Sequence, residues 1–254
     1  MIETTILPLQ LKQLRLSAIR ACYEQTSQQA ESDHWSYKQY LAALCDQELA
    51  VREQHRIARN LIEAKLPLGK SIDTFEFGKL TSINVAQLVS FAETTAWVEH
   101  AQNLILFGPS GVGKTHIAAS IGRRQIEKGK RVYFTKTTTI MQKLQVAYGE
   151  QKLQTALDKL TKYDLLILDD IDYAKKTDAE TSVLFELIAD RYETKSLLII
   201  ANQPFDKWNS IFPSSEVAVA AIDRLIHHAT IISFEEKSYR KAAFIAEQEK
   251  KNVN

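Results

Sequence analysis

The apolar residues in the first part of the chain recur at the spacing of an α-helix. Residues 10–64 contain neither glycine nor proline, and two apolar series run through this stretch, with Glu48 as the one polar break in the second series. Because each helix must bury its apolar face, the pattern predicts a small helical bundle, with Ser36 as the N-cap of its later helix. The two series are Leu11, Leu14, Ala18 and Cys22, and then Tyr37, Leu41, Leu44 and Val51.

The pattern changes after Pro67 and Gly69, which together interrupt the helix. From there, short and almost wholly apolar runs alternate with amphipathic stretches. Such runs are typical of strands buried on both faces of a parallel sheet, so the alternation predicts an α/β domain. We expect a helical domain at residues 1–69 and the α/β domain at residues 70–254. The expected strands are residues 103–107, 131–134, 165–168, 196–201 and 230–234, and the expected helices include 116–125, 138–148, 151–162, 216–228 and 239–251.

A glycine-rich segment lies between the first expected strand and its helix. Residues 108–115 fit the pattern G-x-x-x-x-G-K-[ST], in which main-chain amides of a tight turn surround phosphate oxygens. Lys114 is expected to reach the β- and γ-phosphates of ATP, and Thr115 to hold Mg²⁺. A glycine turn that caps an ordinary helix is the alternative, but the order strand, loop, helix favours a phosphate loop. The residues expected to bind nucleotide are Gly108, Pro109, Ser110, Gly111, Val112, Gly113, Lys114, Thr115 and His116.

Polar residues at the ends of later elements are further catalytic candidates beside Lys114. Asp169 and Asp170 end the third apolar run, where Asp169 can hold Mg²⁺ and Asp170 can orient or deprotonate the attacking water. Asn202 ends the fourth run and can contact the γ-phosphate or that water, or be an ordinary turn residue. Arg224, near a helix end, is either a surface residue or a group that enters a neighbour's site and neutralises charge on the transferring phosphoryl group.

Charge is segregated along a chain of 254 residues whose net charge is only +1. Residues 112–164 hold eleven Lys or Arg and four Asp or Glu, whereas residues 165–216 hold five and ten. Because a polyanion binds local positive surface, the basic segment is a DNA candidate. An arginine stripe on one helix face is a second candidate, and a solvated surface is the alternative for both. The candidates are Lys130, Arg131, Lys136 and Lys143, and then Arg52, Arg56 and Arg59.

Other features limit the chemistry and the compartment. Cys22 and Cys45 lack metal-ligand spacing, which indicates buried free thiols in a reducing cytosol. His227 and His228 have no ligand spacing with Cys or acidic residues, so no metal beyond Mg²⁺ is expected. No apolar stretch approaches membrane length and the start does not resemble a signal peptide, so we expect a cytoplasmic protein without a membrane partner.

The chain resembles AAA+ ATPases and, within them, the IstB family of transposition helper ATPases, relatives of the DnaC helicase loaders. The phosphate loop is generic to many nucleotide enzymes, whereas residues 11–16, 41–52 and 221–228 are what resembles IstB. The resemblance implies a five-stranded parallel sheet between helices. It also implies Lys114 and Thr115 as Walker A, Asp169 and Asp170 as Walker B, Asn202 as sensor 1 and Arg224 as arginine finger. Many relatives have Glu where Asp170 stands, and the shorter side chain implies slow hydrolysis.

This resemblance implies an ATP-dependent, DNA-binding ATPase with ATP and Mg²⁺ as cofactors. Such a protein forms homo-oligomers on double-stranded DNA and assists the transposase of the same element in target selection. A DnaC-like loader of a replicative helicase on single-stranded DNA is the near alternative. A small-molecule kinase, which leaves the N-terminal helices and Arg224 without a role, and a scaffold that binds ATP without turnover also stay open.

Overall fold

The computed structural model describes residues 5–75, 77–79, 83–172, 177–204, 208, 215–235 and 238. The helix expected at residues 239–251 lies outside these residues. Contacts divide the chain into two units, Met1–Arg59 and Asn60–Asn254. The division falls within helix α3 (Tyr37–Ala64), earlier than the boundary expected at residue 69. The reason is that the last turns of α3 belong to the second unit, where Glu63 pairs with Arg131 at 3.2 Å.

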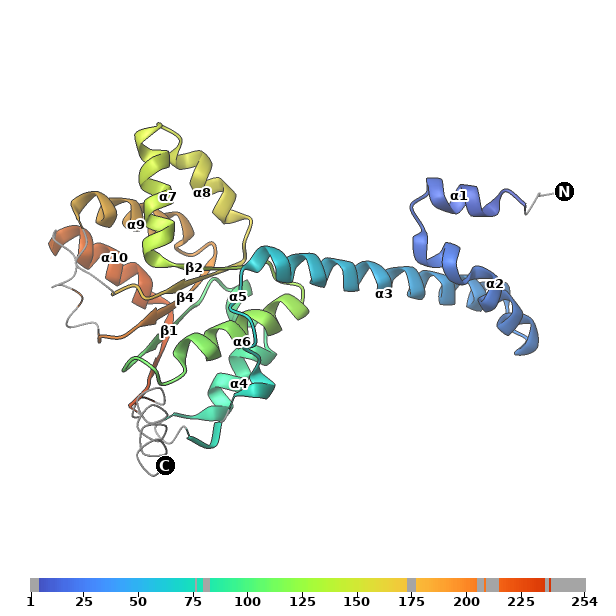
Figure 1. Ribbon diagram of the computed structural model, residues 1–254, viewed down its shortest axis with the longest axis horizontal. Coiled ribbons are helices and arrows are strands. Elements are labelled where there is room, and N and C mark those ends of the chain that lie inside the picture. Colours follow the sequence, from blue (N-terminus) through green and yellow to red (C-terminus); the bar gives the residue numbers. More distant parts are fainter. Residues whose placement is uncertain are drawn as a thin grey trace, which may run out of the picture. The chain divides into compact units, whose positions relative to one another are not determined.

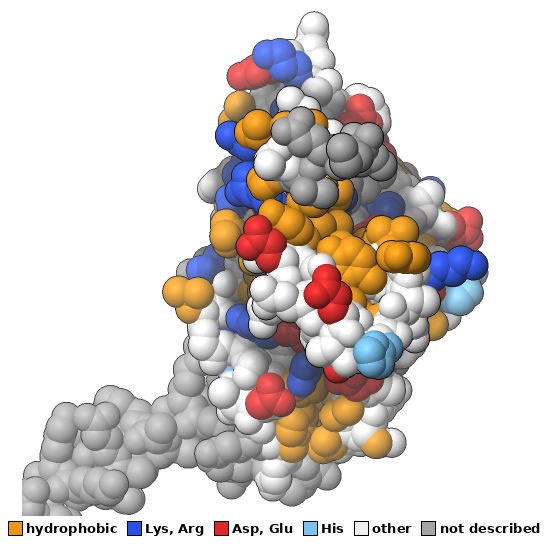
Figure 2. Space-filling view, turned by 90° about the vertical axis from the view of Figure 1, so that its right-hand side faces the viewer, with side chains coloured by type: hydrophobic (Ala, Val, Ile, Leu, Met, Phe, Trp, Pro, Cys, Tyr) orange, Lys and Arg blue, Asp and Glu red, His pale blue; other side chains and the backbone are white. Residues whose placement is uncertain are grey.

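The first unit consists of α1 (Leu7–Gln13), α2 (Ser17–Ser32) and α3 as far as Arg59. Its buried apolar cluster contains Leu11, Ile19 and Leu44. Cys22 is partly buried against this cluster, whereas Cys45 is exposed, so the prediction of a buried thiol is wrong for Cys45. The two apolar series are only partly buried, because Leu14 follows the end of α1 and is 66% exposed, and Leu41 is 60% exposed. On the face drawn in Figure 2, hydrophobic side chains gather near the centre of the view with acidic side chains next to them.

Ser36 begins α3 as expected. The N–H of Gln39 donates to Oγ of Ser36 at 3.3 Å, and the N–H of Ser36 donates to Oε1 of Gln39 at 2.8 Å. These two reciprocal bonds form a capping box, which satisfies amides that a helix start otherwise leaves unpaired. The predicted N-cap is thereby confirmed.

Contacts of its carboxylate explain why the polar residue Glu48 interrupts the apolar series. Its side chain is buried, and Oε2 accepts hydrogen bonds from the main-chain N–H groups of Ala18 at 2.8 Å and Ile19 at 3.1 Å. These amides belong to the first turn of α2, where a negative charge is favourable. Oε1 accepts from Nε of Arg52 at 2.9 Å. The carboxylate therefore fastens the start of α2 to α3.

The second unit is a five-stranded sheet with helices on both faces (Figure 1). All four strand pairs are parallel and the order is β2-β3-β4-β1-β5, which confirms the expected α/β fold. The strands are β1 (Asn103–Phe107), β2 (Val132–Lys136), β3 (Leu165–Asp169), β4 (Ser196–Ala201) and β5 (Ala229–Ser233).

Helices α4, α5 and α6 lie on one face of this sheet and α7 to α10 on the other (Figure 1). Their bounds are α4 (Val85–Glu93), α5 (Ala96–Glu99), α6 (Lys114–Glu127), α7 (Thr137–Gly149), α8 (Leu153–Thr161), α9 (Asp178–Arg191) and α10 (Ser215–His227). Two short 3₁₀ helices, η1 (Ile72–Thr74) and η2 (Phe77–Lys79), precede α4. Among the residues that the structure describes, no helix combines the length and apolar character needed to cross a bilayer.

The strand order decides where the candidate residues meet. Strand β4 lies between β1 and β3, and all three run in the same direction. Their carboxyl ends therefore share one edge of the sheet, which is where open α/β sheets place their ligands. The phosphate loop follows β1, Asp170 follows β3 and Asn202 follows β4. The fold thus brings together three segments that are far apart in the sequence.

Candidate nucleotide-binding site

The loop between β1 and α6 requires glycine at its two ends. Gly113 is the N-cap of α6 with φ 100°, and a Cβ atom there would lie 2.7 Å from Cε2 of Phe75. Gly108 has φ 142°, and a Cβ atom there would lie 2.3 Å from the carbonyl oxygen of Phe234. Both positions combine a left-handed backbone with a close neighbour, so a side chain would distort the loop. The result is a narrow turn with helix amides at its floor, which fits a phosphate group.

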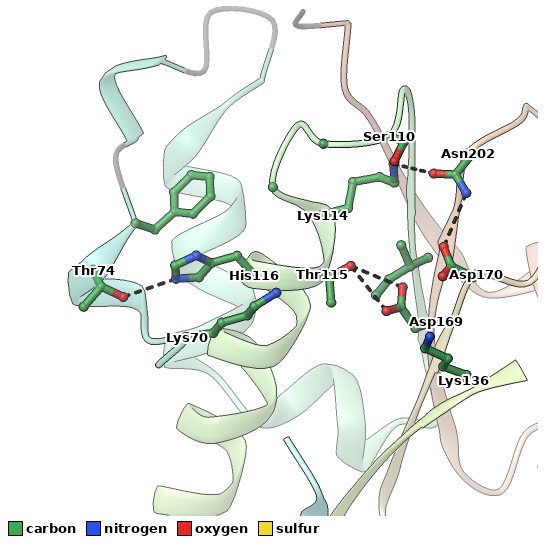
Figure 3. Close-up of a pocket in the computed structure, with 14 residues that line it drawn as sticks. Lys70, Thr74, Ser110, Lys114, Thr115, His116, Lys136, Asp169, Asp170 and Asn202 are labelled. Carbon is green, nitrogen blue, oxygen red and sulfur yellow. Dashed lines mark hydrogen bonds between the residues drawn. The ribbon is translucent and has the colours of Figure 1, made fainter. Parts of the chain in front are cut away.

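Lys114 holds its ammonium group inside this loop. The residue is 5% exposed, and Nζ donates to the carbonyl oxygens of Gly108 at 2.6 Å and Pro109 at 2.8 Å. It also donates to Oδ1 of Asn202 at 3.1 Å (Figure 3). The positive charge is thus placed at the junction between the phosphate loop and the end of β4. Both predicted phosphate contacts, Lys114 and Asn202, lie in one hydrogen-bonded group.

Thr115 and Asp169 provide oxygen ligands of the kind that Mg²⁺ prefers. The hydroxyl of Thr115 donates to both carboxylate oxygens of Asp169 at 3.3 Å. Burial, and then the neighbouring charge of Asp170, raise the pKa of the Asp169 carboxyl above its ordinary value. A cation beside this carboxylate would offset both effects. The pair therefore fits a magnesium ion held by one hydroxyl and one carboxylate, with the remaining ligands from water and phosphate.

Asp170, Asn202 and Asp172 form a second polar group at the same edge. Asp170 has φ 55°, a conformation that aspartate tolerates better than most residues. The side-chain amide of Asn202 donates to Oδ1 of Asp170 at 3.4 Å and to Oδ1 of Asp172 at 3.3 Å. Asp172, which is buried, also accepts from the main-chain N–H of Asn202 at 2.7 Å. Asp172 was not among the predicted site residues, although it is the third acidic residue of an Asp-Asp-Ile-Asp run.

These groups surround one cavity of about 570 Å³ (Figure 3). Its size is in the range of small-molecule sites. Nine of the predicted residues line it: Ser110, Gly111, Gly113, Lys114, Thr115, His116, Asp169, Asp170 and Asn202. Gly108, Pro109 and Val112 shape the loop without lining the cavity. Lys70, Thr74, Phe75 and Lys136 also line it, and the sequence analysis had placed Lys136 among the DNA candidates.

His116 ties the segment before the domain core to the phosphate loop. Its Nε2 atom lies 2.9 Å from the carbonyl oxygen of Ser71 and 3.2 Å from Oγ1 of Thr74. The ring of Phe75 meets the His116 ring edge to face at a centroid distance of 5.1 Å. Thr74 and Phe75 line this side of the cavity, and both contact His116.

The comparison with protein families agrees with this geometry. The family described as IstB-like ATP binding protein matches residues 9–245. The chain belongs to this family. The IstB-like chain is similar to a putative insertion sequence ATP-binding protein of Sinorhizobium fredii, with 47% identity over 94% of this chain and 80% of the relative.

Solved structures show the fold of this IstB-like protein. The DnaI structure matches with a TM-score of 0.56 and 19% identity, over 66% of this chain and 92% of the other. The DnaC helicase loader matches with a TM-score of 0.50 and 20% identity, over 66% and 98%. The second unit thus has the fold of these two proteins, and the protein is a member of an ATP-binding family.

Arg224 of the IstB-like chain is not among the described residues that line the nucleotide cavity. Its Nη1 donates to the carbonyl oxygen of Ala220 at 3.1 Å, within α10. Its guanidinium carbon lies 5.0 Å from the centre of the Phe185 ring, on α9. The residue lines a separate surface hollow with Tyr192 and His227. Of the five catalytic candidates, the structure brings four together and leaves Arg224 apart.

The DNA candidates have several different environments. Lys130 pairs with Glu99 at 2.7 Å. Arg131 pairs with Glu63, and its guanidinium lies over the ring of Tyr163. Nζ of Lys143 lies 3.5 Å from the hydroxyl of Tyr133, in a hollow that Lys65 and Lys159 also line. On α3, Arg52 pairs with Glu48 and Arg56 with Glu53, while Arg59 is exposed. Of the basic segment, Lys136 and Lys143 are exposed, and Lys143 lies in a hollow that three lysines and Glu63 line.

Proposed function

We propose that the protein is an ATPase that assembles on duplex DNA with bound ATP and assists a transposase in selecting its target. The relationship between Arg224 and the nucleotide cavity carries this proposal. The cavity of one chain is lined by the phosphate loop, by Thr115 and Asp169 as the proposed magnesium ligands, and by Asp170 and Asn202 as the proposed water-orienting residues. The arginine that would complete it faces elsewhere. A second chain that supplies Arg224 would complete the site, which couples hydrolysis to assembly.

The residues of one chain divide the work in this proposal. The loop amides and Lys114 bind the β- and γ-phosphates of ATP. Thr115 and Asp169 hold Mg²⁺, which supplies charge neutralisation at these phosphates. Asp170 accepts a proton from the attacking water, and Asn202 orients that water. The aspartate at this position is one methylene shorter than glutamate, so hydrolysis is slow while binding is retained.

The Sinorhizobium relative supports the biological setting, because it is named as a putative insertion sequence ATP-binding protein. The transposase of the same element is then the partner protein. The exposed apolar side chains of the first unit, among them Leu9, Leu14 and Leu41, support a role of the N-terminal helices in protein contacts.

The test is assembly on DNA, followed by sedimentation velocity and electron microscopy with ATP, Mg²⁺ and duplex DNA. The wild type is expected to form large particles only when nucleotide and DNA are both present. Lys114→Ala is expected to stay unassembled, whereas Lys152→Ala, which removes an exposed lysine, should assemble normally. A wild-type protein that stays a single chain under saturating conditions would contradict the proposal.

The same sample separates the nearest alternative. A helicase loader would favour single-stranded DNA, so competition between duplex and single strands in the presence of ATP distinguishes the two functions. We expect the duplex to compete better. Phosphate release from the assembled protein separates an ATPase from a scaffold, and transfer of phosphate to a metabolite would indicate a kinase.

A further inference from the structure

Two histidines and a glutamate meet at the ends of two neighbouring helices. His227 is the last residue of α10, His228 follows it, and Glu193 lies two residues after the end of α9. One possible ligand atom from each of the three residues lies within 4.8 Å of the others. The sequence analysis expected no metal at the histidine pair because no acidic residue stands at ligand spacing. The packing of α9 on α10 supplies that residue from a distant part of the chain.

The geometry favours convergence on one point. Nε2 of His228 lies 3.4 Å from Oε1 of Glu193, and the centres of the two imidazole rings are 4.1 Å apart. Tetrahedral ligands at about 2.1 Å from one metal ion lie about 3.4 Å apart, which matches the separation of the His228 and Glu193 donor atoms. Small rotations of exposed side chains therefore suffice to bring three donor atoms to a common centre.

Tyr192 holds one ring nitrogen of His227 in a hydrogen bond. The hydroxyl of Tyr192 lies 2.7 Å from Nδ1 of His227. In the tautomer that carries its proton on Nδ1, this nitrogen donates to the hydroxyl and leaves Nε2 with a free lone pair. Histidines that bind metals usually hold their second ring nitrogen in such a hydrogen bond. The pair thus provides the fixed ring and the available nitrogen together.

The surroundings suit a cation that arrives from solvent. Glu193, His227 and His228 are all exposed, so an ion has direct access. The carbonyl groups at the end of α10 carry partial negative charge and favour a cation nearby. Two imidazoles and one carboxylate select zinc and similar transition metals, whereas Mg²⁺ and Ca²⁺ prefer oxygen ligands alone.

We propose that Glu193, His227 and His228 form a binding site for a divalent transition-metal ion of the zinc class. Three protein ligands leave one coordination position for water or for a donor from another molecule. The ion would join the end of α10 to the end of α9 and so stiffen the helix that carries Arg224. An effect of this stiffening on hydrolysis depends on the proposed role of Arg224, whereas the metal site itself does not.

Titration of Zn²⁺ into the full-length, nucleotide-free protein by calorimetry tests the site, with Co²⁺ absorption as a second readout of the ligands. The wild type is expected to bind one ion at this site. Glu193→Gln and His228→Gln should each weaken its binding by about tenfold or more, and Tyr192→Phe should weaken it by a similar factor through the lost hydrogen bond. His55→Gln, an exposed histidine of α3, and His34→Asn, in a turn of the first unit, are matched controls that should bind like the wild type.

Amide hydrogen exchange supplies a readout that does not depend on ATPase activity. Zinc should slow exchange at the end of α10 in the wild type and in the His55→Gln control, but not in Glu193→Gln. Equal zinc affinity of the wild type and the Glu193→Gln and His228→Gln variants would overturn the proposal, as would a wild type that binds no ion. Because the result is measured without nucleotide or DNA, it stands apart from the outcome of the assembly experiment.

Discussion

The carboxylate of Asp172 accepts a hydrogen bond of 2.7 Å from the main-chain N–H of Asn202. A second bond reaches the same carboxylate oxygen from the N–H of Gln203. Asp172 follows β3 and Asn202 follows β4, so these bonds join the two strand ends that carry Asp170 and Asn202, the residues proposed to act on the attacking water. Asp172 is therefore a positioning residue for Asn202.

Asp172→Asn should impair turnover more than nucleotide binding. The single oxygen of the amide can still accept from the N–H groups of Asn202 and Gln203, but without the negative charge. Its NH₂ group then faces the side-chain amide of Asn202, which is also a donor, so the Asn202 side chain loses its hold. We expect kcat to fall about 10- to 100-fold with KM changed much less, since a charge-assisted bond contributes about 1.5–3 kcal/mol. Steady-state ATPase kinetics measure this split. Asp46→Asn, on the exposed surface of α3, is the control, and an equal rise of KM with unchanged kcat would argue against positioning.

Arg224→Ala should leave nucleotide affinity unchanged, because Arg224 does not line the cavity of its own chain. Hydrolysis by the assembled protein should fall by about 10³ or more if the arginine acts on a neighbour's nucleotide. Mixing Arg224→Ala with Asp170→Asn, which keeps nucleotide binding and so can still assemble, tests whether the arginine is supplied by a neighbouring chain. The first variant has an intact cavity and the second an intact arginine, so mixed assemblies should regain part of the activity. Without any regain, the arginine does not act between chains.

Asp170→Asn should keep nucleotide binding and lose hydrolysis. Asparagine tolerates the left-handed backbone at this position, so the loop conformation is retained while the proton acceptor is removed. A loss of about 10² or more in turnover is expected from removal of a general base. Asp170→Glu should raise turnover, because its carboxylate reaches farther toward the water. If Asp170→Asn hydrolyses ATP at the wild-type rate, another group must accept the proton.

Much of the site was predictable because its signals are local. The phosphate loop depends on glycines at fixed spacing, and the structure explains two of them by positive φ and close neighbours. Asp169, Asp170 and Asn202 were predictable because parallel strands share a carboxyl edge. Lys136 ends β2 at that same edge, yet counting charge along the chain had placed it with the DNA candidates.

The remaining features depend on contacts between distant segments. Asp172 and Glu48 accept hydrogen bonds from main-chain amides of other elements. The spacing of apolar residues along the sequence cannot predict such bonds. Glu193 meets His227 only because α9 packs on α10. Leu14 belongs to an apolar series, but α1 ends before it and leaves it exposed. Periodicity predicted elements well, whereas the ends of elements and the contacts across them required the fold.

Lys136 and Lys143 should separate nucleotide binding from DNA binding. Lys136 lines the cavity with Asp169 and Asp170, so Lys136→Ala should weaken nucleotide binding and leave the salt dependence of DNA binding unchanged. Lys143→Ala should weaken DNA binding and lower its salt slope by about one, as expected for one lost phosphate contact. Nucleotide affinity and DNA affinity over a salt series measure the two effects. If Lys136→Ala lowers the salt slope of DNA affinity and Lys143→Ala does not, the DNA contacts the sheet edge at the nucleotide cavity and not the surface around Lys143.

Glu48 should make the start of α2 sensitive to acid. Burial alone would raise the pKa of this carboxyl, but the N–H groups of Ile19 and Ala18 and the charge of Arg52 hold it below its ordinary value. A carboxyl with a lowered pKa in the folded state stabilises that state above its unfolded pKa of about 4.3. This stabilisation is lost as the pH falls through the lower, folded pKa.

Glu48→Gln should therefore destabilise the start of α2 at neutral pH, by about 1–3 kcal/mol for the weakened bonds to Ala18 and Ile19. Amide exchange at these two residues measures the effect, since both amides are protected by the carboxylate. The variant should exchange faster at pH 7, and the difference from the wild type should shrink toward acid pH. Glu53→Gln removes another arginine-paired glutamate of α3 that makes no described contact with α2, and it should leave this exchange unchanged. Equal protection of Ala18 and Ile19 in the Glu48→Gln variant and the wild type would mean that α2 is held by its apolar contacts alone.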